Sequence, residues 1–325
     1  MKLTTLSRRS ILHVLPVILL PAGFARAQDA YPSRPIRLVL PGSPGNITDT
    51  MARLMARSVG DQLGQPVVVE NKPGAGGILA TESVVRAKPD GYTILMVSAP
   101  IVTNPGLYDK LPYDTLKDLA PVVLLSENGF LFAVNEKTPW KTMKELVEAS
   151  RKSTDGIAYA SPGIGTVMHL AGQQFNVEYG THFVNVPYKG SAQADQDVVA
   201  GHVPMLIDPI VTNLGMIKQG RLRALAVSHP TRQPELPDVP TVRELGFPKV
   251  ETKSFSGFMV AAGTPREIIM KLNTVFNNAI NDPEIRKVLA TQNLVGGTPE
   301  KFGAMLRSET DRWVPLIKKL KIKPE

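Results

Sequence analysis

Short β-branched segments alternate with helical patterns along most of the chain, and this alternation constrains the fold more than any other feature. Seven segments have the composition of strands: Ile36–Leu40, Val67–Glu70, Thr93–Val97, Ile157–Ala160, Phe183–Val186, Met205–Ile207 and Leu222–Val227. Helical periodicity fills the intervals, as in 48–63, where Met51, Met55 and Val59 fall on one stripe. Strands that alternate with helices predict an α/β protein with largely parallel sheets.

Polar residues at fixed spacing predict where several helices begin. Thr142 with Glu145, and Thr241 with Glu244, have the spacing of a capping box. Three further caps are predicted where a threonine or aspartate precedes a proline at the first helical position: Thr264, Asp282 and Thr298. The C-terminal third of the chain is therefore expected to be mostly helical.

Two long apolar segments, 122–135 and 250–265, interrupt the strand–helix rhythm and flank a middle block with its own βα series. A chain that enters a second domain and returns needs two such crossings. We therefore predict one domain from residues 31–130 plus 257–325 and a second from 131–256. Two domains in simple tandem are the alternative, which would leave the helical tail without a sheet to cover.

The first 27 residues have the pattern of a signal peptide. A basic stretch, "MKLTTLSRRS", precedes a short apolar run, and "ARA" at 25–27 fits a cleavage site. The run is too short and too interrupted by proline to span a membrane. The pattern predicts export to the periplasm with cleavage near Ala27. "SRRSIL" also resembles a twin-arginine signal, so the export route is open.

Composition excludes several classes of function. The chain has no cysteine, which rules out disulfides, thiolate metal sites and thiol nucleophiles. Its net charge of +8 would fall to +4 after removal of the four basic residues of the first 27. No Lys/Arg run with interleaved aromatic residues is present, so we expect no nucleic-acid partner. A mild positive charge suits small anionic solutes.

Five junctions between predicted strands and helices are rich in glycine or other small residues. They are "PGSPGNITD" (41–49), "NKPGAGG" (71–77), "SAPIVTN" (98–104), "SPGIGTVMH" (161–169) and "YKGSAQAD" (188–195). Ligands of open α/β sheets bind outside the carboxyl ends of the strands, where such loops lie. Glycine lets backbone N–H groups approach a ligand closely, so these loops predict anion binding.

Motifs for nucleotide binding and for catalysis are absent from the sequence. A dinucleotide fingerprint on Gly74 and Gly76 needs Gly or Ala where Leu79 stands, and no Gly-Lys-Ser/Thr follows the cluster. There is no G-x-S-x-G elbow and no HExxH pair. We expect no enzyme activity, no metal and no cofactor.

Two polar residues near helix starts have both a structural and a functional interpretation. His169 falls in the first turn of a helix after a glycine loop, where it would either contact a ligand or tie the loop down. Asp49 is placed to cap its helix, and the functional alternative is contact with a ligand's ammonium or hydroxyl group.

Several long stretches together resemble the periplasmic substrate-binding proteins of tripartite tricarboxylate transporters, the Bug proteins. They are "YPSRPIRLVLP", "VVVENKPGAGGILATESVVRAKPDGYTIL", "YASPGIGTVMHLAGQQF", "FVNVPYKGSAQADQDVVAGHVPMLIDP" and "LRALAVSHPTRQPELPDVPTVRELG". The resemblance covers nearly all of the chain after the leader, in the order of the family. It implies a periplasmic-binding-protein-like fold of two α/β domains joined by crossover strands, with a ligand cleft between them.

The same resemblance implies a set of residues that hold a small carboxylate. They would be Gly45, Asn46, Asp49, Gly76, Gly77 and Ser98 in the first domain and Gly163, Thr166, His169, Gly190 and Asp208 in the second. It also implies a membrane permease with a large and a small subunit as partner, and we expect the receptor itself to be a monomer.

Three departures from the family pattern bear on specificity. The first loop has an extra proline and asparagine in "PGSPGNITD", and Ile78-Leu79-Ala80 replaces the usual Asn-Ile-Gly after Gly77. The aliphatic side chains of Ile78 and Leu79 are expected to make this wall of the site less accessible to water. The aromatic residue common before the second crossing is missing from "KSFSGF", although Phe255 and Phe258 are near.

The resulting hypothesis is capture of a carboxylate-type solute in the cleft, hinge closure and delivery to a tripartite tricarboxylate transporter. A second hypothesis keeps the cleft but makes a sensor or signalling protein the partner. A third is an exported hydrolase or isomerase that uses His169 with Asp49 or Asp208, which lacks a recognisable nucleophile.

Overall fold

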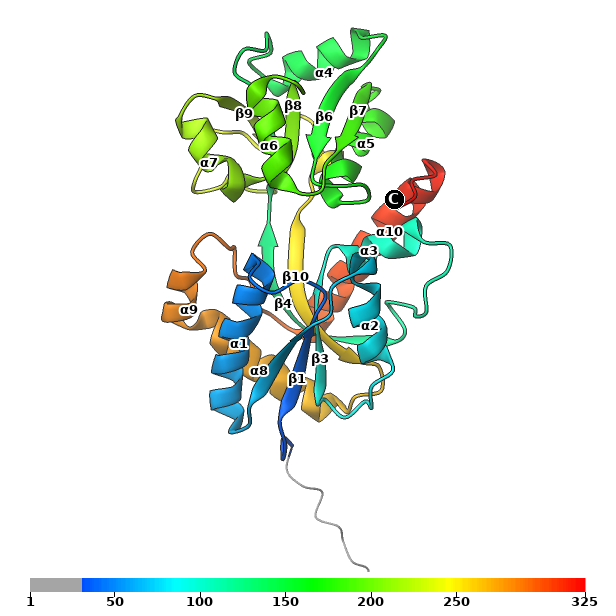
Figure 1. The fold of residues 1–325 in the computed structure, drawn as a ribbon, viewed down its shortest axis with the longest axis vertical. Coiled ribbons are helices and arrows are strands. Elements are labelled where there is room, and N and C mark those ends of the chain that lie inside the picture. The colour runs from blue at the N-terminus through cyan, green and yellow to red at the C-terminus, as the bar shows by residue number, and fades with distance from the viewer. Residues whose placement is uncertain (1–30, 325) are drawn as a thin grey trace, which may run out of the picture. The chain divides into compact units, whose positions relative to one another are not determined.

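The computed structural model describes residues 31–324, whose strands form two five-stranded sheets (Figure 1). The first sheet has the order β2-β1-β3-β10-β4, with β1 Ile36–Leu40, β2 Val67–Asn71, β3 Thr93–Ser98, β4 Leu119–Asn128 and β10 Ser254–Ala261. The second has the order β7-β6-β8-β5-β9, with β5 Phe130–Asn135, β6 Ile157–Ser161, β7 Phe183–Pro187, β8 Met205–Pro209 and β9 Leu222–Val227. The predicted signal peptide lies outside the described residues.

The helices follow the strands in chain order. They are α1 Ile47–Leu63, α2 Ile78–Val85, α3 Pro100–Leu107, α4 Met143–Lys152, α5 Val167–Tyr179, α6 Ser191–Ala200, α7 Ile210–Lys218, α8 Arg266–Asn281, α9 Pro283–Val288 and α10 Pro299–Lys319. Two short 3₁₀ turns, η1 Ala75–Gly77 and η2 Pro248–Val250, complete the set. No helix within 31–324 has both the length and the apolar character needed to cross a bilayer.

Both sheets are mixed, so the prediction of largely parallel sheets is wrong for two of the four strand pairs in each. Strand β10 runs antiparallel to β3 and β4, and β5 runs antiparallel to β8 and β9. The reversed strands belong to the two segments where the chain changes sheet. β5 follows β4 after the single residue Gly129, and β10 returns to the first sheet after β9 (Figure 1). The predicted α/β class is confirmed.

Helices α1 and α8 pack with the first sheet in one apolar cluster. The stripe predicted on α1 supplies Met51, Met55 and Val59, all buried. Across the cluster, Phe258 of β10 stacks on Phe276 of α8 with ring centroids 4.2 Å apart. Helix α1 begins where Asn46 Oδ1 accepts a hydrogen bond from the backbone N–H of Asp49, at 2.8 Å.

A larger apolar cluster includes residues from both sheets. Phe302 and Trp313 of α10 and Leu107 of α3 belong to it, and it continues to Phe132 of β5 and Phe175 of α5. The C-terminal helix is therefore part of the core that supports both sets of strands.

The predicted helix starts at Thr142, Asp282 and Thr298 are confirmed, because each side chain caps a helix. The prediction of a cap at Thr264 is wrong. The Thr264 hydroxyl donates to the carbonyl of Ala261, and Pro265 is the residue that directly precedes α8. The reciprocal bonds between Thr241 and Glu244 do form, but only a turn follows them. A glycine at 246 and a proline at 248 end that segment before a helix can extend.

Candidate functional site

A cavity of about 330 Å³ lies at the carboxyl ends of β1 and β3. Four of the six residues predicted for the first half line it: Asn46, Gly76, Gly77 and Ser98. Gly76 and Gly77 turn the chain into α2 with φ angles of +58° and +87°, which glycine adopts readily. The Asn104 side chain holds this turn by donating to the carbonyl of Gly76 at 3.0 Å.

The two other predicted residues of the first half, Gly45 and Asp49, do not line this cavity. The Asp49 carboxylate accepts hydrogen bonds from Arg53 Nε at 2.9 Å, from Asn71 Nδ2 at 3.0 Å and from the Gly45 N–H at 3.0 Å. Arg53, then the Gly45 N–H and Asn71, lower the pKa of Asp49 to about 2. Asp49 therefore stays charged and fixes the first loop, which is the structural role.

A second cavity, of about 370 Å³, is lined by elements attached to both sheets. Gly76, Ser98, Pro100 and Asn104 line both cavities, so the two spaces share one wall. Residues 164–168 at the start of α5 contribute from the second sheet, and Ser254 and Phe255 contribute from the first residues of β10. Because β10 is antiparallel to β3, with Ser256 opposite Ser98, its start lies at the same sheet edge as the end of β3.

Thr166 is the predicted residue of the second half that reaches this cavity. Its hydroxyl donates to the carbonyl of Gly163 at 2.8 Å and accepts from the N–H of His169 at 3.3 Å. The hydroxyl donor is thus already used inside the protein. The backbone N–H groups of Val167 and Met168 belong to the first turn, where helix donors have no intrahelical acceptor. Thr166 therefore fixes the start of α5 at the cavity.

The sequence left two roles open for His169, contact with a ligand or attachment of the preceding loop. The structure shows that its side chain holds the loop. Its Nδ1 accepts a hydrogen bond from the Gly165 N–H at 3.0 Å, and the side chain is only 6% exposed. Burial lowers the pKa of His169 to about 4, so the ring is neutral near pH 7. Among residues 31–324 no hydrogen bond joins His169 to Asp49 or Asp208, the two carboxylates that the hydrolase hypothesis paired with it.

Gly163, Gly190 and Asp208 stand outside both cavity linings. Gly190 precedes α6, and Asp208, fully buried at the end of β8, accepts from Ser191 Oγ at 2.6 Å and from Thr212 Oγ1 at 2.7 Å. Burial raises the pKa of Asp208. This carboxyl fixes the start of α6 to the second sheet.

The sequence did not single out several residues that line the larger cavity. They are Asn104, Leu107, Tyr108, Met168 and Phe255. Asn104 belongs to the segment 98–104, which the sequence predicts as a loop but which forms α3 from Pro100 onward. For Phe255 the sequence indicates only an aromatic residue near the second crossing. Ile78 and Leu79 line neither cavity, so they do not form the predicted dry wall.

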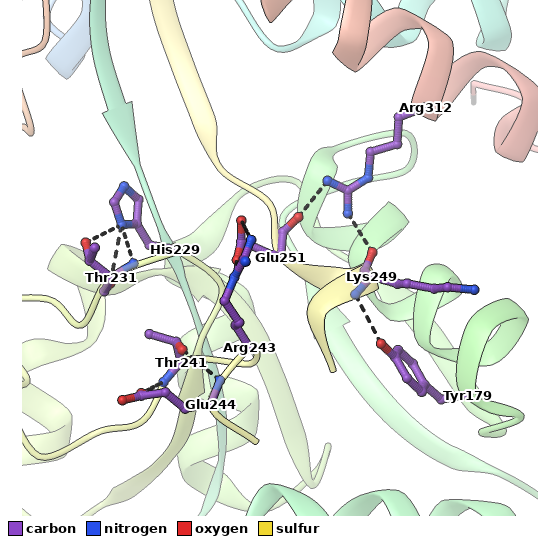
Figure 2. Close-up of polar contacts among 9 residues, drawn as sticks. All are labelled: Tyr179, His229, Thr231, Thr241, Arg243, Glu244, Lys249, Glu251 and Arg312. Atoms are coloured by element: carbon purple, nitrogen blue, oxygen red, sulfur yellow. Dashed lines mark hydrogen bonds and ion pairs between the residues drawn. The ribbon is translucent and has the colours of Figure 1, made fainter. Parts of the chain in front are cut away.

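Beside this site, the chain segment that returns from β9 to β10 is tied to helix α10 by Arg312 (Figure 2). The guanidinium donates to the backbone carbonyls of Glu251 at 2.6 Å and Lys249 at 3.0 Å, and to Gln174 Oε1 of α5 at 2.6 Å. The Lys249 N–H in turn donates to the Tyr179 hydroxyl at 3.1 Å. The return crossing is thus held between a helix of the C-terminal third and α5.

The fold and the site together define a solute-binding protein. Segments attached to both α/β sheets line one cavity, and its lining side chains are neutral polar or apolar within residues 31–324. A family model described as "Tripartite tricarboxylate transporter family receptor" matches residues 51–322.

Named relatives agree with this match. BugT of Bordetella pertussis is 33% identical over 314 residues, covering 95% of this chain and 96% of the relative. A solved R. palustris protein with adipate is 30% identical with a TM-score of 0.75, covering 91% of this chain and 100% of that one. MatC from Rhodopseudomonas palustris with bound malate is 31% identical with a TM-score of 0.72, covering 88% and 100%.

This chain belongs to the tripartite tricarboxylate transporter family of receptors. Its relatives are binding proteins and not enzymes, and the predicted periplasmic-binding-protein-like fold is confirmed.

Proposed function

We propose that this protein captures a small carboxylate in the periplasm and delivers it to a two-subunit membrane permease. The family match supports the transporter partner, and the signal-like first 27 residues support export. Related proteins have been solved with adipate and with malate, which supports a carboxylate as the ligand. The receptor is proposed to act as a monomer with two domains, 31–130 plus 257–325 and 131–256.

One observation carries the proposal: the same cavity is lined by Ser98 at the end of β3, by Gly76 of the turn after β2 and by the start of α5 from the second sheet. Within residues 31–324 the hydroxyl of Ser98 makes no hydrogen bond, so it is free to donate to a ligand. The backbone donors and the partial positive charge at the start of α5 are available to the same anion. A carboxylate held from both sides would favour a closed state, because a ligand shifts a conformational equilibrium towards the state that binds it more tightly.

We expect Ser98→Ala to weaken carboxylate binding roughly tenfold or more, because a hydrogen bond to a charged group contributes about 1.5–3 kcal/mol. The measurement is calorimetry on mature protein that has been unfolded and refolded to remove bound solute. Ser83→Ala, which removes a partly buried hydroxyl on α2 outside both cavities, is the control. Equal affinity in the Ser98 variant and the wild type would reject Ser98 as a contact.

A broader result tests the function itself. Mature protein that binds no carboxylate in a panel of malate, adipate, citrate, benzoate and hexanoate would overturn carboxylate capture. Export is checked by N-terminal sequencing of protein from a periplasmic fraction, where a start near Gln28 is expected.

A further inference from the structure

The larger cavity has a polar side and an apolar side. The residues that it shares with the smaller cavity include Gly76, Ser98 and Asn104, which form the polar side. The residues that line the larger cavity alone include four large apolar side chains, Leu107, Val167, Met168 and Phe255, together with the hydroxyl-bearing Thr103, Tyr108, Thr166 and Ser254. A molecule that fills this space therefore meets hydrogen-bonding groups at Gly76, Ser98 and Asn104 and large hydrocarbon side chains from α3, α5 and β10.

The polar side is built around Gly76. Asn104 and Tyr108 stand one turn apart at α3, so both reach the same glycine. The Asn104 amide donates to the Gly76 carbonyl at 3.0 Å, and the Tyr108 hydroxyl would stand 3.7 Å from a methyl group added at Gly76. With Ser98 next to them, these groups give one compact set of neutral polar contacts.

The cavity linings offer no charged side chain that could pair with a second carboxylate of a ligand. Neither cavity is lined by an Asp, Glu, Lys, Arg or His residue, as far as the described chain extends. The arginine of the first loop, Arg53, is already paired with Asp49. One carboxylate uses the hydrogen-bond donors at Ser98 and at the start of α5, whereas a second one would lie against side chains such as Leu107 and Phe255 without a charged partner. Burial of an unpaired charge against hydrocarbon is strongly unfavourable.

We propose that the ligand is a monocarboxylate with an apolar body, either aliphatic or aromatic. Its carboxylate lies at Ser98 and Gly76, and its body lies against Leu107, Met168 and Phe255. This inference rests on the proposed function, because it names the class of carboxylate that the same site accepts. It separates this chain from the relatives solved with malate and adipate, which are dicarboxylates.

The test is a calorimetric panel on refolded mature protein with benzoate, hexanoate, malate, adipate and citrate. We expect benzoate or hexanoate to bind at least about tenfold more tightly than each of the other three. Tighter binding of malate, adipate or citrate would overturn the monocarboxylate inference and leave the receptor function standing. An absence of binding to every member would overturn both.

A pair of methionine variants places the apolar body. Met168→Gln keeps the length of the side chain but adds an amide, and we expect it to weaken hexanoate binding roughly tenfold. Met216→Gln, at a partly buried methionine of α7 outside both cavities, is the matched control and should leave the affinity unchanged. Equal affinity of the Met168 variant and the control would overturn the placement.

Discussion

Gly165 lies directly against Leu107. A methyl group added at Gly165 would stand 2.5 Å from Leu107 Cδ1, closer than two carbon atoms can approach. Leu107 ends α3 beside the first sheet, whereas Gly165 belongs to the loop between β6 and α5 of the second. The backbone of Gly165 also has φ +75° and donates to His169. This contact therefore joins the two walls of the larger cavity.

The first prediction is that Gly165→Ala weakens ligand binding, because the added methyl group pushes the start of α5 away from α3. Gly220→Ala is the matched control, since Gly220 has a similar φ of +66° but nothing within 4 Å of an added methyl group. Both variants should lose about 1–2 kcal/mol of unfolding free energy from the left-handed backbone, and the Gly165 variant should lose more because of the contact with Leu107. Only the Gly165 variant should lose affinity in calorimetry. Equal affinities would show that the contact is not needed for the site.

The second prediction concerns a buried pair of carboxyl groups. Asp195 of α6 is 4% exposed and lies beside Asp208. Within residues 31–324 its Oδ1 atom has no hydrogen-bond partner, and the same is true of Asn213 Oδ1. Burial, then the charge of Asp208, raises the pKa of Asp195 to about 7, and a proton on Asp195 would supply the missing donor. The native state therefore takes up a proton that the unfolded chain releases above about pH 4.

The contribution of Asp195 to the free energy of unfolding should therefore be largest below about pH 4. It should decrease as the pH rises from about 4 to 7. We expect Asp195→Asn, which supplies its own donors, to flatten the fall in melting temperature across that range. Thermal denaturation at a series of pH values measures it. The exposed Asp155→Asn serves for comparison, and a variant curve parallel to that of the wild type would contradict the shared-proton interpretation.

The third prediction concerns the connection between α10 and the return crossing. Arg312→Met keeps the apolar stem of the side chain but removes the donors to Gln174 and to the carbonyls of Lys249 and Glu251. We expect a loss of about 1–3 kcal/mol in unfolding free energy, because two backbone carbonyls lose a charged donor. Chemical denaturation measures it, and hydrogen exchange should increase in residues 249–253.

Arg307→Met on the same helix provides the control for this substitution, because Arg307 is exposed and makes no ion pair among residues 31–324. It should leave both the stability and the exchange unchanged. If the two variants behave alike, the hydrogen bonds of Arg312 do not hold the crossing.

Local patterns predicted much of the secondary structure. Strands β1 and β9 have the predicted bounds, and β6 and β7 extend one residue further. Alternation and capping depend on neighbours a few residues away, so the sequence displays them directly. The Thr241–Glu244 pair shows the limit: its local bonds form, yet no helix follows, because continuation depends on what comes next in the chain.

The sequence by itself determined the α/β class, the loops at the strand ends and the two segments in which the chain changes sheet. Only the tertiary structure decided which loop residues line the two cavities. Asp49 and His169 look functional in sequence, but the Asp49 carboxylate is bonded to Gly45, Arg53 and Asn71, and His169 Nδ1 is bonded to Gly165. Leu107 and Met168 look like ordinary helix residues, but they form the apolar wall of the cavity. The physical reason is that a cavity is made by elements far apart in the chain, and the spacing of residues within one segment carries no record of what packs against it.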